Sequence, residues 1–464
     1  MIAQTTDATA VDDAAVQDFA LGLRGTLIRP GDDGYDTARK VWNGMIDRRP
    51  ALIVRCADAD DVVRTVNLAR RQNLPVSVRG GGHSTPGFAV CDSGLVIDLS
   101  RMKGITVNPE TRTALAEPGL TLKELIEATQ PHGLVTTTGV VSDTGIAGLT
   151  LGGGIGWLEG KFGLACDNVL SFDVVTADGQ LRHACADENP ELYWALRGGG
   201  GNFGVVTAFE YRLHPLGNVL AGMVVHPMPR AREVLRFYRD FTASAPDELT
   251  AYAALLTAPD GHPAVAIILC YCGPLDEGER IVAPVRQFGS PVVDHIHPMN
   301  YVDVIQLIDA GNPPGHHYYE KGCSVQHLTD EAIDALVASG AALTSPFSVV
   351  LIQHMHGAAS RIPPHATAFT LRGEYYLPLF IAQWPGGAAD RHIAWARTSW
   401  AAMQPFASGG TYVNFMAGDE QDRVRAAYGP NYDRLVAIKN KYDPTNFFRH
   451  NQNIRPSIST DDGW

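Results

Sequence analysis

The sequence has no basic cluster and no long apolar run. Asp and Glu number 50 against 37 Lys and Arg, which gives a formal net charge of −13 and a pI near 5.6. An acidic chain repels phosphate backbones and anionic headgroups, so nucleic acid and membrane surfaces are not expected partners. Residues 1–7 lack the basic and apolar regions of a secretory signal peptide. We therefore expect a cytoplasmic protein whose partner is a small molecule.

Cysteine is scarce as well. The seven cysteines are odd in number and scattered along 464 residues, whereas a disulfide framework has paired cysteines in a short chain. Cys270 and Cys272 stand close together, but a zinc site would need a second pair. The sequence therefore predicts reduced thiols, places these two in a buried strand, and gives no metal site.

The first part of the chain alternates strands and helices. A strand is predicted at residues 52–54, a helix at 57–72 from its apolar spacing and acidic first turn, and another strand at 74–78. With 45% hydrophobic residues, a chain of this length buries a large core and forms two or more domains.

The pattern changes after residue 215. Long strands and separate helical segments predict an antiparallel sheet with helices on one face. From about residue 412 the glycine, asparagine and aromatic residues of the first part return, so the C-terminus is expected to rejoin the first domain. The fold class is thus α+β. The first domain is expected at 1–215 (core about 46–215), the second at 216–405, and residues 406–464 are expected to return to the first domain. The strands are predicted at 222–226 and 264–271, and the helices at 230–241, 276–286 and 329–338.

A glycine turn leaves the strand at 74–78. It reads Arg79-Gly80-Gly81-Gly82-His83-Ser84, and its backbone N–H groups can face an anion because glycine has no Cβ to keep a ligand away. The imidazole of His83 stands beside these groups as a nucleophile. The turn therefore predicts a phosphate-binding loop with a reactive histidine.

Two other glycine segments look like nucleotide-binding motifs but have the wrong context. Gly199, Gly201 and Gly204 satisfy G-x-G-x-x-G, yet a dinucleotide fingerprint follows a strand and opens a helix. This segment follows a helical pattern at 189–196 and opens a strand at 205–209. Gly160-Lys161 is followed by phenylalanine, so it is not a P-loop.

The glycine clusters and their flanking motifs occur in one order that resembles a known family. The chain resembles the berberine bridge enzyme-like flavin oxidases, of the para-cresol methylhydroxylase and vanillyl-alcohol oxidase fold, and in particular bacterial members such as the hydroxynicotine and oligosaccharide oxidases. The matching segments are VRGGGHS at 78–84, GGGIGW at 152–157, GLACDN at 163–168, WALRGGGGNFGVV at 194–206, YVNF at 412–415, DPTNFF at 443–448 and NQNI at 451–454.

The resemblance implies a two-part FAD-binding domain and a substrate-binding domain between its parts. In such proteins the histidine of the glycine turn is bonded to the flavin 8α-methyl carbon, and that histidine is His83. Some members have a second link from a cysteine, but Val141 stands at that position, so FAD is expected to be bound covalently through one histidine. The other residues implied to bind FAD are Arg79, Gly80, Gly81, Gly82, Ser84, Thr144, Gly145, Gly148, Gly152, Val206 and Asn451.

The expected chemistry needs a proton acceptor beside the flavin. An oxidised flavin accepts a hydride at N5 while the protein takes a proton from the adjoining O–H or N–H. The resemblance assigns that role to Tyr412, with Asn414 as its partner or as a flavin contact. A phenol needs a cationic or hydrogen-bonding neighbour to lower its pKa from near ten. The alternative is a strand tyrosine packed on the core with a satisfied hydroxyl.

The substrate side is expected on the sheet of the second domain. Gln353, the third candidate catalytic residue, stands where many relatives have a glutamate, and the missing carboxylate disfavours a cationic amine. Leu377 and Leu379 replace polar side chains of plant relatives, which favours an aromatic or apolar substrate. Residues 316–320, HHYYE, resemble a metal cluster, but they follow Pro-Pro-Gly in a predicted loop. Pocket lining is the favoured role of this segment over metal ligation.

Two functions follow from the resemblance. The first is an FAD-dependent oxidoreductase that oxidises a small alcohol, hemiacetal or amine and passes the electrons to O2, giving hydrogen peroxide. The alternative is a flavin-dependent cyclase or rearrangement enzyme of polyketide or alkaloid biosynthesis. The substrate, the true electron acceptor and the oligomeric state are not specified by the sequence.

Overall fold

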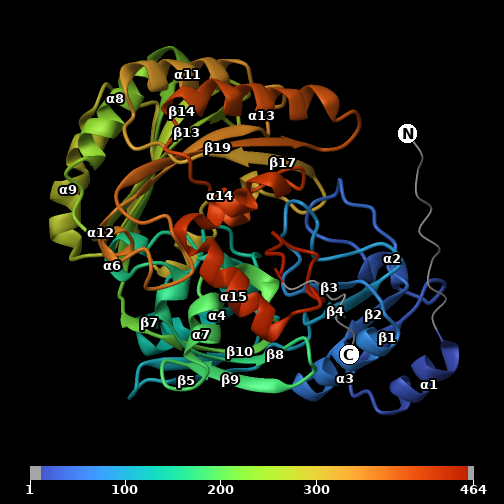
Figure 1. Ribbon diagram of the computed structural model, residues 1–464. Helices are drawn as coiled ribbons and strands as arrows, with labels where there is room; N and C mark the ends of the chain where they lie inside the picture. The colour runs from blue at the N-terminus through green and yellow to red at the C-terminus, as the bar shows by residue number, and fades with distance from the viewer. Residues whose placement is uncertain (1–11, 458–464) are drawn as a thin grey trace.

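A small sheet lies on the N-terminal side of the protein (Figure 1). In this computed structural model, which describes residues 12–457, strands β2, β4 and β3 of that sheet run parallel and β1 forms an antiparallel edge. Helix α3 begins where Asp58 accepts a hydrogen bond from the Asp61 N–H, and its buried side includes Val62 and Val66. The predicted strand, helix and strand are confirmed as β2, α3 and β3. The elements are α1 (Asp13–Leu21), β1 (Thr26–Ile28), α2 (Tyr35–Ala38), β2 (Leu52–Arg55), α3 (Ala59–Arg71), β3 (Val76–Arg79) and β4 (Leu95–Asp98).

A second sheet is antiparallel, with strand order β5-β6-β10-β8-β9. The glycine segment at 198–204 follows helix α7 and leads into strand β10, which is the context that excluded a dinucleotide fingerprint. Its elements and the short ones around it are β5 (Ile105–Asn108), β6 (Thr113–Ala116), α4 (Leu122–Thr129), β7 (Leu134–Val135), α5 (Ile146–Gly152), α6 (Glu159–Phe162), β8 (Val169–Val175), β9 (Leu181–Cys185), α7 (Pro190–Leu196), β10 (Val205–Arg212) and β11 (His214–Pro215).

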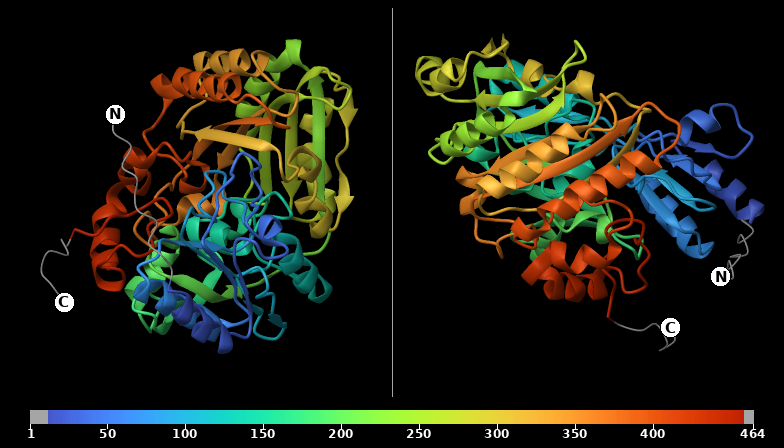
Figure 2. Two further views of the ribbon diagram at one scale, coloured as in Figure 1. Left: turned by 90° about the vertical axis from the view of Figure 1, so that its right-hand side faces the viewer. Right: turned by 90° about the horizontal axis from the view of Figure 1, so that it is seen from above.

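The third and largest sheet has eight antiparallel strands in the order β15-β12-β14-β13-β18-β19-β17, with β16 also paired to β12. Helices α8, α9, α11 and α13 cover its outer face (Figures 1 and 2), so the predicted sheet backed by helices is confirmed. The elements are β12 (Val219–Pro227), α8 (Ala231–Thr242), β13 (Leu249–Thr257), β14 (Pro263–Tyr271), α9 (Leu275–Gln287), β15 (Val293–Asp294), β16 (His297–Met299), α10 (Tyr301–Ile305), β17 (His317–Gly322), α11 (Asp330–Ala341), β18 (Val349–Met355), α12 (Gly357–Arg361), β19 (Tyr375–Trp384) and α13 (Asp390–Met403).

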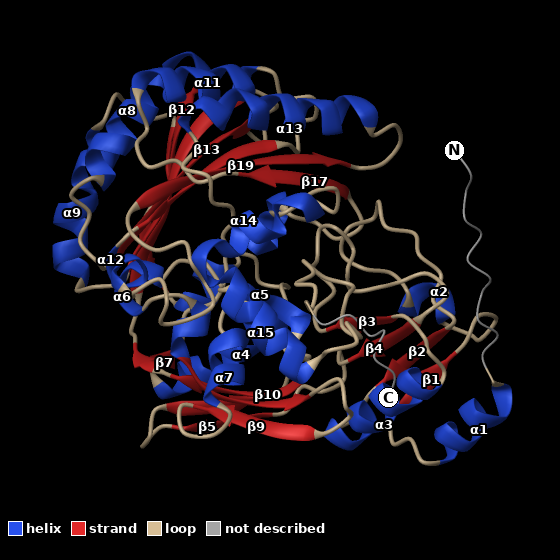
Figure 3. Ribbon diagram, in the orientation of Figure 1, coloured by secondary structure: helices blue, strands red, loops and turns tan. Residues whose placement is uncertain are grey.

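The last part of the chain returns to the first two sheets. In Figure 3, α14 (Val424–Tyr428) and α15 (Tyr432–Tyr442) lie at the front of the protein, below the large sheet and above the second sheet. The fully buried ammonium of Lys439 on α15 is 2.6 Å from Asp443 Oδ2 and donates to the carbonyl oxygens of Asn202 (2.7 Å) and Phe448 (2.9 Å). A buried charge persists only when it is paired and hydrogen-bonded, so these bonds tie the C-terminal segment to the glycine segment at 198–204.

One predicted domain limit falls between elements and the other falls inside a short one. The limit at 215/216 lies between β11 and β12, and the limit at 405/406 lies within the 3-10 turn (Gln404–Phe406) that follows α13. We propose both as domain boundaries. Residues 1–11 and 458–464, at the two ends of the predicted FAD-binding parts, lie outside the described residues, as does the segment considered for a signal peptide. Within residues 12–457, no helix combines the length and the hydropathy that a bilayer crossing requires.

One local prediction is wrong. Residues 316–320 were expected in a loop, but residues from His317 onward form strand β17, paired antiparallel with β19 so that Tyr318 lies opposite Gln383 and Glu320 opposite Ile381. Two consecutive tyrosines have high β-propensity, which outweighs the Pro-Pro-Gly before them. The described residues contain no group of three side chains placed to bind a metal.

Candidate active site

A cavity of about 1020 Å³ separates the glycine segments from the open face of the large sheet. This volume lies at the upper end of the range for small-molecule sites. The glycine turn, the segment at 139–151, the segment at 200–206 and residues 448–452 form one wall, and β12, β13, β14, β17, β18 and β19 form the other. The cavity therefore meets both parts that the sequence assigned to cofactor and substrate.

The glycine turn packs directly on the start of helix α5. A Cβ on Gly81 would lie 2.4 Å from the backbone nitrogen of Gly145, and a Cβ on Gly145 would lie 2.4 Å from that of Gly81. Gly82 has φ +72°, in the left-handed region that favours glycine. Side chains at these positions would push the two backbones apart, so the glycines bring two rows of N–H groups to one wall of the cavity.

Most of the residues expected to bind the cofactor line this cavity, but two lie behind it. Arg79 donates to the backbone oxygens of Ala38 and Lys40, and its Nε is 3.7 Å from Asp98 Oδ1, so it braces the turn. Gly152 leaves room for the side chain of Asn414, because a Cβ there would lie 2.3 Å from Asn414 Oδ1. The lining members are Gly80, Gly81, Gly82, His83, Ser84, Thr144, Gly145, Gly148, Val206 and Asn451.

His83 is enclosed by an aromatic ring and a carboxylate. The Trp42 ring is stacked on it, with centroids 4.0 Å apart and planes at 22°. Its Nε2 lies 3.3 Å from Asp143 Oδ1 but makes no hydrogen bond of good geometry. These neighbours hold the imidazole ring at the cavity wall and leave its Nε2 free to react.

Tyr412 and Asn414 are brought together, as the sequence suggested. The Tyr412 hydroxyl accepts hydrogen bonds from Asn414 Nδ2 at 2.7 Å and from the Gly154 N–H at 2.9 Å. Tyr412 precedes a 3-10 turn (Val413–Phe415) rather than lying in a strand. Burial raises the pKa of Tyr412 despite these two donors, which lower it. The phenol therefore keeps its proton at neutral pH, and the role of Tyr412 as the base stays a prediction.

The opposite wall is the inner face of the large sheet. Alternate residues of its strands point to the cavity because side chains alternate along a strand. Among the described lining residues on these strands, the polar side chains are Gln353, Glu320 and, at the end of β13, Thr257. Leu379 lines the cavity and Leu377 packs in the core beside it. The apolar members are Met223, Val225, Ala254, Leu256, Ile268, Val349, Leu351, Leu379 and Ile381.

Gln353 and Glu320 are both buried. Gln353 is 3% exposed and its Oε1 has no hydrogen-bond partner. Glu320 is 9% exposed, and burial raises its pKa to about 7, although a hydrogen bond with the Thr85 side chain lowers it in part. Glu320 is the one carboxyl among the described lining residues, which include no Lys or Arg. Its charge can therefore change near neutral pH.

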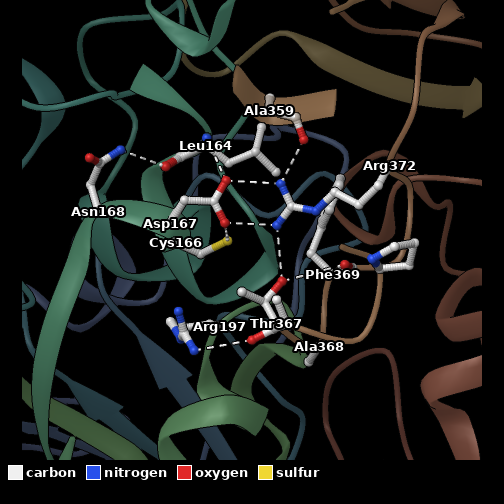
Figure 4. Close-up of polar contacts among 12 residues, drawn as sticks. Leu164, Cys166, Asp167, Asn168, Arg197, Ala359, Thr367, Ala368, Phe369 and Arg372 are labelled. Atoms are coloured by element: carbon white, nitrogen blue, oxygen red, sulfur yellow. Dashed lines mark hydrogen bonds and ion pairs between the residues drawn. The ribbon is translucent and has the colours of Figure 1, made fainter. Parts of the chain in front are cut away.

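The segment GLACDN at 163–168 is held by a buried ion pair (Figure 4). Arg372 donates to both oxygens of Asp167, at 2.7 and 2.9 Å, and their side chains are 1% and 5% exposed. The Cys166 thiol lies 3.7 Å from Asp167 Oδ1, and burial raises its pKa well above the usual value. Cys166 does not line the cavity, so its expected role as a small buried residue agrees with its position.

The residues present fit FAD. The glycine wall offers backbone donors to phosphate groups, and it holds two buried polar atoms that have no hydrogen-bond partner among the described residues: His83 Nε2 and Asn451 Oδ1. Buried polar atoms normally have partners, and the hydroxyl, amino and ring groups of a flavin nucleotide are suitable ones. Val141 also lines the cavity, so the position of a second cysteinyl link holds an inert side chain.

Sequence reasoning missed two residues of this site, Trp42 and Asp143, which contact it but belong to no quoted motif. Glu320 lies in the segment at 316–320, for which pocket lining was the favoured role, and it does line the cavity, but it was not singled out as a catalytic candidate. Asp143 could have been found because it stands one residue before Thr144, an expected cofactor contact. Tyr318 and Glu320 alternate as residues on one face of a strand do, and this signal could have placed the Glu320 carboxyl on the cavity side.

Comparisons with known proteins agree with the geometry. Residues 50–184 match the family model described as an FAD binding domain, and residues 411–455 match the model described as berberine and berberine like. These ranges contain the glycine turn and the Tyr412 segment, respectively.

Full-length relatives are similar over nearly the whole chain. An FAD-linked oxidoreductase of Dictyostelium discoideum is 32% identical over 448 residues, which cover 95% of this chain and 97% of the relative. The (R)-6-hydroxynicotine oxidase of Paenarthrobacter nicotinovorans is 32% identical over 460 residues, covering 95% and 98%.

Solved structures share the fold. The crystal structure of 6-hydroxy-D-nicotine oxidase from Arthrobacter nicotinovorans superposes with a TM-score of 0.86 at 31% identity, covering 94% of this chain and 99% of that one. The berberine bridge enzyme-like protein 1 of Physcomitrella patens has a TM-score of 0.87 at 24% identity, covering 96% and 99%, and shows the fold alone.

Proposed function

The chain belongs to the berberine bridge enzyme-like family of FAD-linked oxidoreductases, and from this premise we propose that it oxidises a small neutral alcohol with an aromatic or apolar body. The cofactor is FAD, and we propose that one covalent bond from His83 to the flavin 8α carbon holds it. The proposed electron acceptor is dioxygen.

The proposed substrate class rests on the cavity wall that the large sheet forms. It presents aliphatic side chains interrupted by Glu320 and Gln353, and no Lys or Arg lies among the described lining residues. Apolar surface favours an apolar substrate body, and a few polar groups orient it. An anionic substrate would lack a cationic partner here, so the wall fits a neutral molecule with one polar group.

Each polar residue has a role that its contacts support. Bound FAD supplies the redox step, because its N5 accepts a hydride from the carbon that bears the hydroxyl, and dioxygen then takes the electrons to give hydrogen peroxide. Tyr412, kept protonated by burial, has its own O–H left to donate because its oxygen accepts the two N–H bonds. The unpartnered Oε1 of Gln353 is free to accept a hydrogen bond from the substrate.

The covalent bond is tested by acid precipitation. Wild-type protein should keep its yellow colour in the pellet, whereas His83→Ala should release all flavin to the supernatant. Ser84→Ala, next in the same turn, is the matched control and should keep the colour in the pellet. Release of flavin from the wild type, or its retention by His83→Ala, contradicts the tether.

The reaction is tested by anaerobic bleaching of the flavin across benzylic alcohols, sugars and secondary amines. Neutral benzylic alcohols should bleach the flavin fastest, and air should restore the colour with one hydrogen peroxide per product. If sugars or amines are faster by an order of magnitude or more, the proposed substrate class is wrong.

A further inference from the structure

We propose that Glu320 is the catalytic residue that accepts the hydroxyl proton of the substrate. The inference rests on the proposed function and names a residue outside every motif that relates the chain to its family. It follows from where strand β17 places this carboxyl and from what surrounds it.

Strand β17 carries Glu320 to the edge of the cavity next to the glycine turn. The side-chain amide of Asn43 donates to the backbone oxygens of Thr85 and Tyr318, at 2.7 and 2.9 Å. The Tyr318 N–H donates back to Asn43 Oδ1 at 3.0 Å. This bridge fixes the strand, two residues before Glu320, against the residue that follows His83 and Ser84. The Thr85 side chain lowers the pKa of the Glu320 carboxyl in part, and Thr85, His83 and Glu320 line the same cavity. Glu320 therefore lies where the sheet wall meets the glycine turn that carries the proposed flavin anchor.

Within residues 12–457, no basic side chain pairs with this carboxyl. Lys321, the next residue, points to the other face of the sheet and pairs with Glu420 at 2.9 Å. The neighbouring strand β19 presents Leu379 and Ile381 to the same side as Glu320. A buried carboxyl that serves stability alone is normally paired or fully hydrogen-bonded, whereas the neighbours of this one are neutral: the Thr85 side chain and aliphatic groups.

The titratable groups around Glu320 allow its protonation state to change. His83 and Tyr412 line the same cavity as Glu320, and Asp143 lies 3.3 Å from His83 Nε2. Tyr318 stands two residues before Glu320 on β17. Burial raises the pKa of Tyr318, with smaller contributions from the charges of Glu320 and Asp143, so this phenol stays neutral. Burial alone raises the pKa of Glu320, to about 7, which is suited to a general base at neutral pH.

The step balances with the proposed redox chemistry. The O–H bond of the alcohol breaks and its proton passes to the Glu320 carboxylate. Bound FAD would accept the hydrogen of the hydroxyl-bearing carbon together with two electrons, so that the C–O single bond becomes a carbonyl. Dioxygen would then take these two electrons with that hydrogen and one proton from solvent to give hydrogen peroxide, and Glu320 returns its proton to solvent.

The kinetic test follows anaerobic flavin bleaching by benzyl alcohol and 4-methoxybenzyl alcohol. The pH is varied between about 5.5 and 8.5, on both sides of the pKa expected for Glu320. The wild-type rate should rise about tenfold per pH unit below 7 and level off above it. Glu320→Gln should be about 10²- to 10⁴-fold slower at the high end with no such rise, and Glu320→Asp should restore part of the rate and the pH dependence.

Glu159→Gln is the matched control. Glu159 is a buried carboxyl whose pKa is also raised, to about 8, but it does not line the cavity. This variant should keep the wild-type pH profile. The same loss of pH dependence in both variants, or its persistence in Glu320→Gln, overturns the proposal.

A binding measurement separates this inference from the proposed function. Wild-type holoprotein whose flavin has been photoreduced under anaerobic conditions cannot oxidise an alcohol probe. Near pH 8.5 it should bind 4-methoxybenzyl alcohol at least about tenfold more tightly than the methyl ether of that alcohol, because a carboxylate is a strong acceptor for a hydroxyl. In Glu320→Gln the two affinities should become similar. Equal affinities in the wild type, or no binding of either probe, overturn the role of Glu320. Bleaching by no alcohol, with the binding preference intact, instead contradicts the proposed alcohol oxidation.

Discussion

The indole of Trp42 is stacked between the imidazole of His83 and the phenol of Tyr318. The ring centroids are 4.0 Å apart on the His83 side and 3.7 Å on the Tyr318 side, with interplanar angles of 22° and 24°. The backbone N–H of Trp42 also donates to the Gly82 carbonyl at 3.1 Å. One residue thus joins the glycine turn to strand β17, and the orientation of the proposed flavin anchor depends on the substrate sheet.

Removing this stack should slow covalent attachment of FAD. Trp42→Ala takes away a contact worth about 0.5–1.5 kcal/mol, so attachment is expected to be about threefold to tenfold slower. The measurement incubates apoprotein with FAD and follows the flavin that stays in the acid-precipitated pellet. Trp42→Phe keeps an aromatic face and should behave like the wild type. If Trp42→Ala attaches FAD at the wild-type rate, the stack does not orient His83.

The ion pair of Arg372 and Asp167 should be a main contributor to stability. Arg372→Met leaves the Asp167 carboxylate buried and unpaired, so the free energy of unfolding should fall by about 3–5 kcal/mol. Urea unfolding followed by tryptophan fluorescence measures the change. Arg361→Met is the control, because Arg361 pairs with Asp247 at the surface, where an ion pair contributes about 0–1 kcal/mol. Equal losses of unfolding free energy in the two variants would contradict the prediction that breaking the buried ion pair costs more than breaking the exposed one.

Local patterns predicted the parts of this protein that depend on near neighbours. Helix α3 follows from the capping Asp58 and the apolar spacing after it, and Tyr412 and Asn414 meet because they are two residues apart on one turn. Trp42 and His83, or Asp167 and Arg372, meet only through the packing of segments far apart in the sequence, which leaves no local signal. Glu320 was not singled out because its segment was taken for a loop, and the cavity face of a residue is defined only once its strand is known.

If Tyr412 acts as a protonated hydrogen-bond donor, its removal should lower the rate without changing the pH profile, whereas removal of a base would change that profile. In Tyr412→Phe, the Gly154 N–H and the Asn414 amide lose their acceptor, and unsatisfied buried groups cost about 1–3 kcal/mol. The rate of flavin bleaching by benzyl alcohol should fall about tenfold or more. Its pH dependence between about pH 6 and 9 should keep the wild-type shape, because burial holds the pKa of Tyr412 above this range. A pH profile that flattens in Tyr412→Phe would show that the phenol is the titrating base after all.

Glu159 should make the protein less stable as pH rises. Its side chain accepts hydrogen bonds from the Gly156 N–H at 3.3 Å and the Tyr252 hydroxyl at 3.4 Å, but burial raises its pKa from 4.5 to about 8. Below pH 4.5 the carboxyl is protonated in both the folded and the unfolded chain and has no effect. Between the two pKa values only the unfolded chain releases the proton, so the stability falls by about 1.4 kcal/mol per pH unit. Above about pH 8 the loss is complete.

Glu159→Gln removes this proton linkage and keeps an acceptor of similar size. Its advantage over the wild type in free energy of unfolding should therefore grow from near zero at about pH 4.5 to at most about 4 kcal/mol at pH 8. Urea titrations of both proteins at several pH values measure the difference. Buried histidines such as His354, whose pKa burial lowers to about 3, destabilise both proteins equally at low pH and cancel in the comparison. A difference that stays constant with pH would mean that Glu159 is ionised in the folded protein, which requires a partner for its charge other than the Gly156 N–H and the Tyr252 hydroxyl.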